Sequence, residues 1–215
     1  MGVGYFPSNF VYWRKIPNHE IFKDRIINII KSDSEHFKDD NLINNEKTTL
    51  GNLKIEHELL NYKEFIDSVV YDTLKEMLNH INSRKSILQT NILSSTIIRC
   101  WCSEYYKDSL ISFRNHTNNG RRVYFIDNKK YRSSFTVLYI VNDPNKQNSI
   151  TFVQTSKEGV SSHYHQQLFF HTREREDISE GTVLIFPSSL SYQSDIIKES
   201  GKIIFSCDIL SHFGD

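Results

Sequence analysis

The chain has 215 residues, of which 38% are hydrophobic and 13% aromatic, enough for one folded domain over residues 1–215 and too much for whole-chain disorder. Its 26 basic and 26 acidic side chains give zero net charge, so a nucleic-acid or membrane-surface binder, which normally has a basic excess, is not expected. The sequence has no bilayer-length apolar run, no stretch resembling a secretory signal and only three cysteines, a combination that predicts a cytoplasmic protein with reduced thiols.

The first elements along the chain are predicted to be helical. Residues 18–31 place apolar side chains on one stripe at helical spacing. Residues 33–58 are polar and are expected to form an exposed loop with short pieces of structure. Residues 61–82 carry the widest apolar face, and Asn61 with Glu64 matches a capping box at the start of that helix.

From residue 93 the apolar period changes to two residues, which is typical of strands with one buried face. Cys100 and Cys102 would share one face of the first strand as small packing residues. Many short strands separated by turn residues predict an antiparallel sandwich or barrel over residues 93–215, with residues 1–92 as a helical N-terminal part. The expected strands are residues 96–106, 133–143, 149–154, 162–172, 181–187 and 201–210.

Three histidines, His163, His165 and His171, occupy odd positions of one expected strand and would project from the same face. Two histidines at this spacing can chelate a metal, and a third ligand usually comes from another strand. The alternative is that they are hydrogen-bonded polar side chains on the solvent face of a sheet. Because no carboxylate partner is identified, this second interpretation is favoured.

The residue motifs of common catalytic sites are missing from the sequence. It contains no G-x-S-x-G elbow, no Walker loop, no glycine-rich dinucleotide motif after a strand and no H-E-x-x-H. His116 lies in the polar stretch ISFRNHTNNG, where a histidine is by default a loop residue.

A more specific indication of the family comes from residues 180–210, EGTVLIFPSSLSYQSDIIKESGKIIFSCDIL. This stretch resembles the end of the double-stranded β-helix in Fe(II)/2-oxoglutarate-dependent oxygenases, and is similar to small members from phages and other viruses. Residues 99–120 resemble the segment that leads into the H-x-H or H-x-D ligand motif of that family, and residues 133–144 resemble the strand that follows it. The resemblance implies a cupin-like jelly roll with N-terminal helices packed on one sheet. It also implies a hydroxylase-type dioxygenase, an oxidoreductase that uses Fe(II) and 2-oxoglutarate.

The residues at the matching site positions depart from the family pattern. Arg114 and His116 stand at the two positions of the first ligand motif, which become His116 and Asn118 if the register shifts by two residues. Tyr192 stands at the distal histidine position, and Lys202 stands where an arginine holds the 2-oxoglutarate carboxylate. A guanidinium stays protonated and cannot bind iron, whereas a lysine can hold a carboxylate as a point charge.

Three interpretations of these departures stay open. In one, the iron site is lost and a metal-free pocket binds an anionic small molecule or a protein partner through Arg114, Tyr192 and Lys202. In another, a different set holds a metal, combining His116 with His163, His165 or His171. In the third, the register differs and an active hydroxylase acts on a small molecule or peptide. If the protein is an oxygenase, the candidate catalytic residues are Arg114, His116 and Tyr192, with His116 an iron ligand and Lys202 and Tyr139 candidates for holding 2-oxoglutarate.

Overall fold

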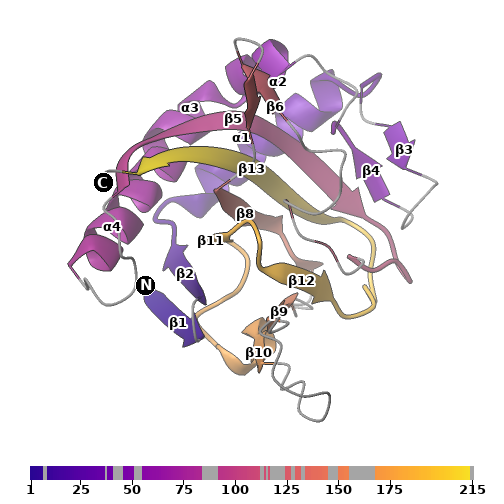
Figure 1. Cartoon of the computed structure of the whole chain (residues 1–215). Helices are drawn as coiled ribbons and strands as arrows, with labels where there is room; N and C mark the ends of the chain where they lie inside the picture. The colour runs from indigo at the N-terminus through magenta and orange to yellow at the C-terminus, as the bar shows by residue number, and fades with distance from the viewer. Residues whose placement is uncertain are drawn as a thin grey trace.

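The computed structural model describes residues 1–215 with gaps at 7–8, 37, 41–45, 51–54, 84–91, 112–113, 115, 117–123, 127–128, 132–133, 145–149, 155–167 and 214–215. Within the described parts, the chain folds into two main antiparallel sheets with helices on one side (Figure 1). None of the described helices combines the length and the apolar character required to cross a bilayer.

The larger sheet has eight strands in the order β1-β2-β11-β8-β13-β5-β4-β3. Each pair of neighbours is antiparallel, and the two longest strands, β13 and β5, pair with each other. The strands are β1 (Gly2–Phe6), β2 (Asn9–Lys15), β11 (Thr182–Pro187), β8 (Phe135–Asn142), β13 (Lys202–Phe213), β5 (Ile92–Tyr105), β4 (Glu46–Thr48) and β3 (Lys38–Asp40).

The smaller sheet, in the order β10-β9-β12, lies on the opposite side of the larger sheet from the helices (Figure 1). Its strands are β10 (Leu168–His171), β9 (Ile150–Gln154) and β12 (Ser191–Ser194), and β6 (Tyr124–Ile126) and β7 (Lys129–Tyr131) form a separate hairpin. A short 3-10 turn, Thr172–Glu174, follows β10. Two antiparallel sheets packed face to face form a jelly roll, as the sequence predicts.

The helices cover the outer face of the larger sheet (Figure 1). They are α1 (His19–Ser32), α2 (Ile55–Asn61), α3 (Lys63–Phe65), a π-helical turn (Ile66–Val70) and α4 (Tyr71–Asn82). The long apolar face predicted for residues 61–82 is confirmed, because its members from Tyr62 to Ile81 pack in the core against the sheet, all of them buried except the partly buried Leu78. The predicted capping box is wrong, since the Asn61 amide donates to Asp33 and Glu64 instead pairs with Arg25 on α1.

Strand periodicity sorts the apolar side chains into two cores. The helical-side core lies between the helices and the larger sheet and takes Val137 and Tyr139 from β8. The interior core lies between the two sheets and takes Leu138 and Ile140 from the same strand. The predicted packing role of Cys100 and Cys102 is confirmed, because both belong to the helical-side core.

The N-terminal residues contribute more strands than the sequence predicts. β2 pairs with both β1 and β11, and its run Phe10–Trp13 is buried on both faces, which explains why it lacks an alternating pattern. Part of the stretch expected to be an exposed loop, residues 33–58, forms β3 and β4 and extends the larger sheet beside β5. The polar composition of residues 33–58 did not predict these strands, because Glu46 and Thr48 are buried against polar partners rather than in an apolar core.

Candidate functional site

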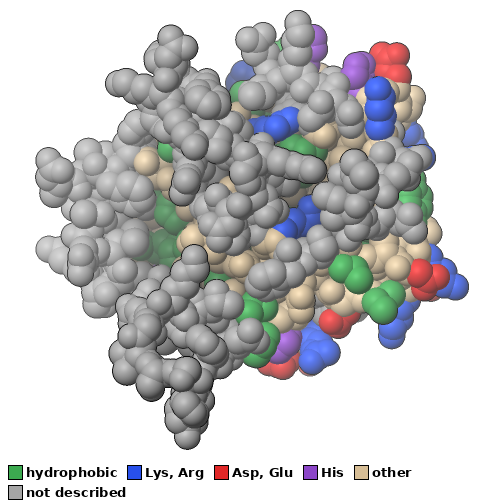
Figure 2. All heavy atoms as spheres, turned by 45° about the vertical axis from the view of Figure 1, so that its right-hand side comes forward, with side chains coloured by type: hydrophobic (Ala, Val, Ile, Leu, Met, Phe, Trp, Pro, Cys, Tyr) green, Lys and Arg blue, Asp and Glu red, His purple; other side chains and the backbone are tan. Residues whose placement is uncertain are grey.

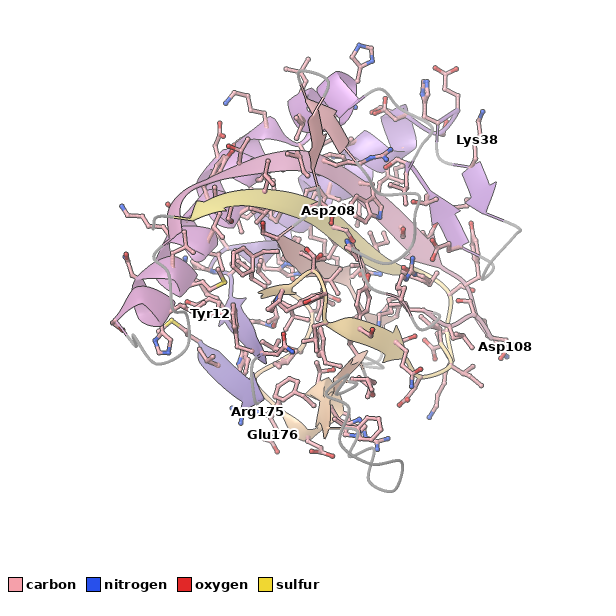
Figure 3. The ribbon with its side chains drawn as sticks, in the orientation of Figure 1. Tyr12, Lys38, Asp108, Arg175, Glu176 and Asp208 are labelled. Carbon is pink, nitrogen blue, oxygen red and sulfur yellow. The ribbon has the colours of Figure 1, made fainter. Side chains whose placement is uncertain are left out.

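The interior face of β13 carries charged residues among apolar ones. Side chains of a strand alternate between faces, so Lys202, Ile204 and Asp208 share the interior side, while Cys207 faces the helices. Lys202 is 2% exposed and Asp208 is fully buried. In Figure 3 Asp208 lies toward the middle of the view, whereas Lys38 and Asp108 lie at its edge. Buried charges are costly unless they are paired, so the partners of these side chains define a candidate site.

Arg114 is held opposite Tyr192 by an isolated two-residue bridge next to β12. The Arg114 amide donates to the Tyr192 carbonyl at 3.0 Å, and the Tyr192 amide donates to the Arg114 carbonyl at 2.8 Å. The guanidinium Nη2 donates to Glu46 Oε2 at 3.2 Å and to the Tyr105 hydroxyl at 3.1 Å. The Nε atom is buried and has no acceptor among the described residues. The Arg114 side chain as a whole keeps 13% of its surface exposed, so the group is not sealed off.

The surroundings of Arg114 keep it charged. Burial by itself would lower the pKa of Arg114, but Tyr105, Tyr192 and Glu46 outweigh burial and raise that pKa above its usual value. Burial raises the pKa of Tyr105, and Glu46 raises it further against the opposing effect of Arg114. The local arrangement is therefore a permanent cation beside a carboxylate and a protonated phenol.

His116 lies next to this group, and both of its ring nitrogens are engaged. Its Nδ1 is 2.5 Å from Asp208 Oδ1, and its Nε2 is 2.9 Å from the Tyr192 hydroxyl. We assign the proton of this contact to Nδ1, because an ionised carboxylate only accepts hydrogen bonds. The ring also stacks on Trp101, with 5.6 Å between centroids. His116 and Asp208 are both fully buried, so these contacts fix the ring in one orientation.

Lys202 forms the second charged pair of the interior. Its Nζ lies 3.9 Å from Asp143 Oδ1, and both side chains are nearly inaccessible to solvent. Burial lowers the pKa of Lys202, and the nearby Asp143 and Asp195 carboxylates oppose that shift. Lys202 pairs directly with Tyr105 in the β13–β5 register, so the two side chains lie on the same face of the sheet. Tyr105 is therefore the register partner of Lys202 and the hydrogen-bond partner of Arg114.

The structure does not bring Tyr139 to this group. Its side chain belongs to the helical-side core, on the opposite face of β8 from Leu138 and Ile140. Its hydroxyl lies 2.5 Å from His19 Nδ1, and its ring stacks on Phe65 with 4.7 Å between centroids.

A second cluster of possible metal ligands lies near the start of α1. His19, Glu20 and Glu180 offer ligand atoms within 4.8 Å of one another. However, Lys23 Nζ lies 2.6 Å from Glu180 Oε1, and the positive N-terminus of α1 begins at His19. Burial alone would raise the pKa of Glu180, but donation from Lys23, the Asp143 amide and His19 outweighs burial and lowers it. The Glu180 carboxylate is thus already paired with a cation, and its contacts with His19 and Lys23 tie the start of α1 to the turn before β11.

The alternative metal set is only partly described. His163 and His165 lie outside the described residues, as does Asn118. His171 ends β10, where its Nδ1 is 2.9 Å from the Thr151 hydroxyl and its ring stacks on the exposed Phe169. The intervening Phe170 packs against the interior core, so His171 faces away from that core and from His116.

Two residues of the group, Glu46 and Asp208, were missed by reasoning from sequence. The sequence could have pointed to Asp208, because it is an acidic residue within an apolar strand and lies an even number of positions from Lys202, on the same face of that strand. Glu46 had none, because it lies in a polar stretch and reaches Arg114 only through the pairing of β4 with β5. The positions that the resemblance matches to metal ligands hold the guanidinium of Arg114, the imidazole of His116 and the phenol of Tyr192. A guanidinium has no lone pair for a metal.

No family model matches the chain, and no curated protein sequence matches it either. The chain is similar to the structure of HygX from Streptomyces hygroscopicus with nickel, 2-oxoglutarate and hygromycin B bound, with 10% identity over 94% of this chain and 81% of HygX and a TM-score of 0.51. HygX with nickel and 2-oxoglutarate bound gives 11% identity over 94% and 82% of the two chains, with a TM-score of 0.50. The viral collagen prolyl hydroxylase from Paramecium Bursaria Chlorella virus-1 gives 15% identity over 92% and 94%, with a TM-score of 0.45. The structural neighbours are 2-oxoglutarate/Fe(II) oxygenases, and the jelly-roll fold expected from the sequence is confirmed.

Proposed function

We propose that this protein is a metal-free relative of the 2-oxoglutarate/Fe(II) oxygenases that binds a small carboxylate through Arg114. The observation that carries the proposal is the partly buried Arg114 guanidinium, whose buried Nε–H has no acceptor among the described residues. A buried donor without an acceptor costs roughly 1–3 kcal/mol, so a ligand oxygen placed there recovers that free energy.

The chemistry of the donor set argues against an iron centre. Non-haem iron needs two histidines and a carboxylate with open positions for its co-substrates. The positions implied by the resemblance hold Arg114, His116 and Tyr192, and both nitrogens of His116 are already hydrogen-bonded. The residues described at these three positions therefore do not fit iron, and no oxidative step follows from them.

The charge of Arg114 favours an anionic ligand such as a carboxylate, because a hydrogen bond from an ionised donor to an anion is stronger than one between neutral groups. Here Nη2 is shared between Glu46 and Tyr105 while Nε is unused within the described structure. Lys202 supports the proposal less strongly, because Asp143 already balances its charge.

The test is a calorimetric titration of the purified protein with succinate, 2-oxoglutarate and L-glutamate. We expect at least one to bind, and Arg114→Gln to weaken that binding by about 10–100-fold, the value of one charged hydrogen bond. Arg25→Gln is the matched control, because Arg25 is half exposed and paired with Glu64 on the helices, and it should leave binding unchanged. Unchanged affinity in Arg114→Gln would refute the proposal.

Metal content provides the second arm of the test. Elemental mass spectrometry is performed on protein purified without added metal and again after anaerobic Fe(II) loading. We expect far less than one metal per chain in both preparations. About one tightly bound iron per chain would overturn the metal-free assignment and favour the hydroxylase activity that the resemblance implies, with 2-oxoglutarate turnover on a small-molecule or peptide substrate as the next assay.

A further inference from the structure

The carboxylate next to Arg114 restricts which ligand the site can accept. Resting on the function proposed above, we infer that the ligand is a zwitterion of the amino-acid class, with its carboxylate on the Arg114 Nε–H and its ammonium on Glu46. Two oppositely charged side chains in contact, each with remaining hydrogen-bonding capacity, form a complementary recognition pair for such a ligand.

Glu46 is held firmly in place for this role. It lies on β4 directly opposite Tyr105 of β5, and it is only 4% exposed. Among the described residues, its carboxylate receives its hydrogen bond from Arg114, through Oε2 at 3.2 Å. A carboxylate has about four acceptor sites on its two oxygens, so one arginine N–H leaves room for the donors of an ammonium group.

Arg114 has the matching unused donor. Its Nη2 contacts both Glu46 and Tyr105, while its buried Nε has no acceptor in the described part of the chain. The unused donor of the cation and the remaining acceptor capacity of the anion therefore belong to two groups in direct contact. In an α-amino acid the carboxylate and the ammonium are attached to the same carbon atom, so one small ligand can present both charges to this pair of side chains.

Charge balance excludes a simple dianion as the preferred ligand. Arg114 is neutralised by Glu46, and the other interior cation, Lys202, is neutralised by Asp143. A dicarboxylate entering this balanced interior would place a second negative charge beside Glu46, and such juxtaposed like charges are unfavourable. An added ammonium turns that repulsion into an attraction.

The experiment compares L-glutamate with 2-oxoglutarate, which share a carbon skeleton and two carboxylates but differ at C2. Calorimetric titration of the wild-type protein should give a dissociation constant at least about 10-fold lower for L-glutamate, as one charged hydrogen bond predicts. Glu46→Gln should bring the two dissociation constants within about threefold of each other or reverse their order. Glu64→Gln, at an exposed glutamate paired with Arg25, is the matched control and should keep the wild-type ratio.

The outcomes separate the two proposals. If 2-oxoglutarate binds as tightly as L-glutamate and Arg114→Gln abolishes both, the zwitterion inference is overturned while the carboxylate site stands. If L-glutamate, 2-oxoglutarate and succinate all fail to bind, both proposals are overturned. Because Glu46→Gln leaves a buried cation unpaired, its folding is checked by urea unfolding, and Glu46→Asp serves as a second variant that should retain the preference for L-glutamate. The wild-type ratio decides the question even where a variant is unstable.

Discussion

Replacing Asp208 tests the buried contacts that hold His116. Asp208 is fully buried, lies 2.5 Å from His116 Nδ1 and accepts a longer contact from the Thr136 hydroxyl at 3.5 Å. Asp208→Ala leaves the buried His116 N–H without its carboxylate, and breaking a buried pair in this way costs about 3–5 kcal/mol. Asp208→Asn keeps an acceptor oxygen for His116 and should cost roughly 1–3 kcal/mol. Since domains are typically stable by only about 5–15 kcal/mol, the alanine variant should lose a large share of the total.

The assay is urea unfolding followed by circular dichroism, with the free energy of unfolding extrapolated to water. Ser206→Ala is the control, because Ser206 lies two residues earlier on the same face of β13 and should cost less than about 1 kcal/mol. A double-mutant cycle with His116→Ala should give a coupling energy above about 1 kcal/mol. A loss below about 0.5 kcal/mol for Asp208→Ala, or a coupling energy near zero, would refute the reasoning.

Three further predictions concern packing and ionisation. The pKa of Glu180 is lowered in the folded protein, so its contribution is present above its ordinary value of 4.5 and is lost as pH falls through the lowered pKa. The stability advantage of wild type over Glu180→Gln, measured by urea unfolding from pH 7 to about pH 3, should therefore shrink on acidification, and a pH-independent difference would contradict this. Gly181→Ala should destabilise more than Gly201→Ala in the same assay. Both glycines have positive φ, at 80° and 96°, but a Cβ at Gly181 would lie 2.8 Å from the His19 ring, whereas a Cβ at Gly201 has no atom closer than 3.9 Å. The three buried thiols should resist a thiol reagent in the folded protein and all react in urea, and rapid labelling of the native state would show that the helical-side core is open.

The apolar periodicity of the sequence predicted the jelly roll because alternation within a strand is a local property. β8 and β11 alternate between the helical-side and interior cores along their length, and both match predicted strands closely. β2 escaped prediction although its run Phe10–Trp13 is buried on both faces, as β8 and β11 also are. The departures at Arg114 and Tyr192 are also visible in the sequence, because the resemblance to the oxygenases assigns both residues to metal-ligand positions.

The partners of those residues were decided by tertiary structure. Glu46 and Arg114 are 68 residues apart in the chain, and His116 and Asp208 are 92 apart. The sequence by itself determined which faces are apolar, where cations stand on the predicted strands and that the total charge is zero. On the described part of the face in Figure 2, basic and acidic side chains are interspersed. Only the sheet pairings determined that each interior cation meets a carboxylate. Hydrophobic alternation is encoded in neighbouring residues, whereas the pairing of charges depends on strand register between segments far apart in sequence.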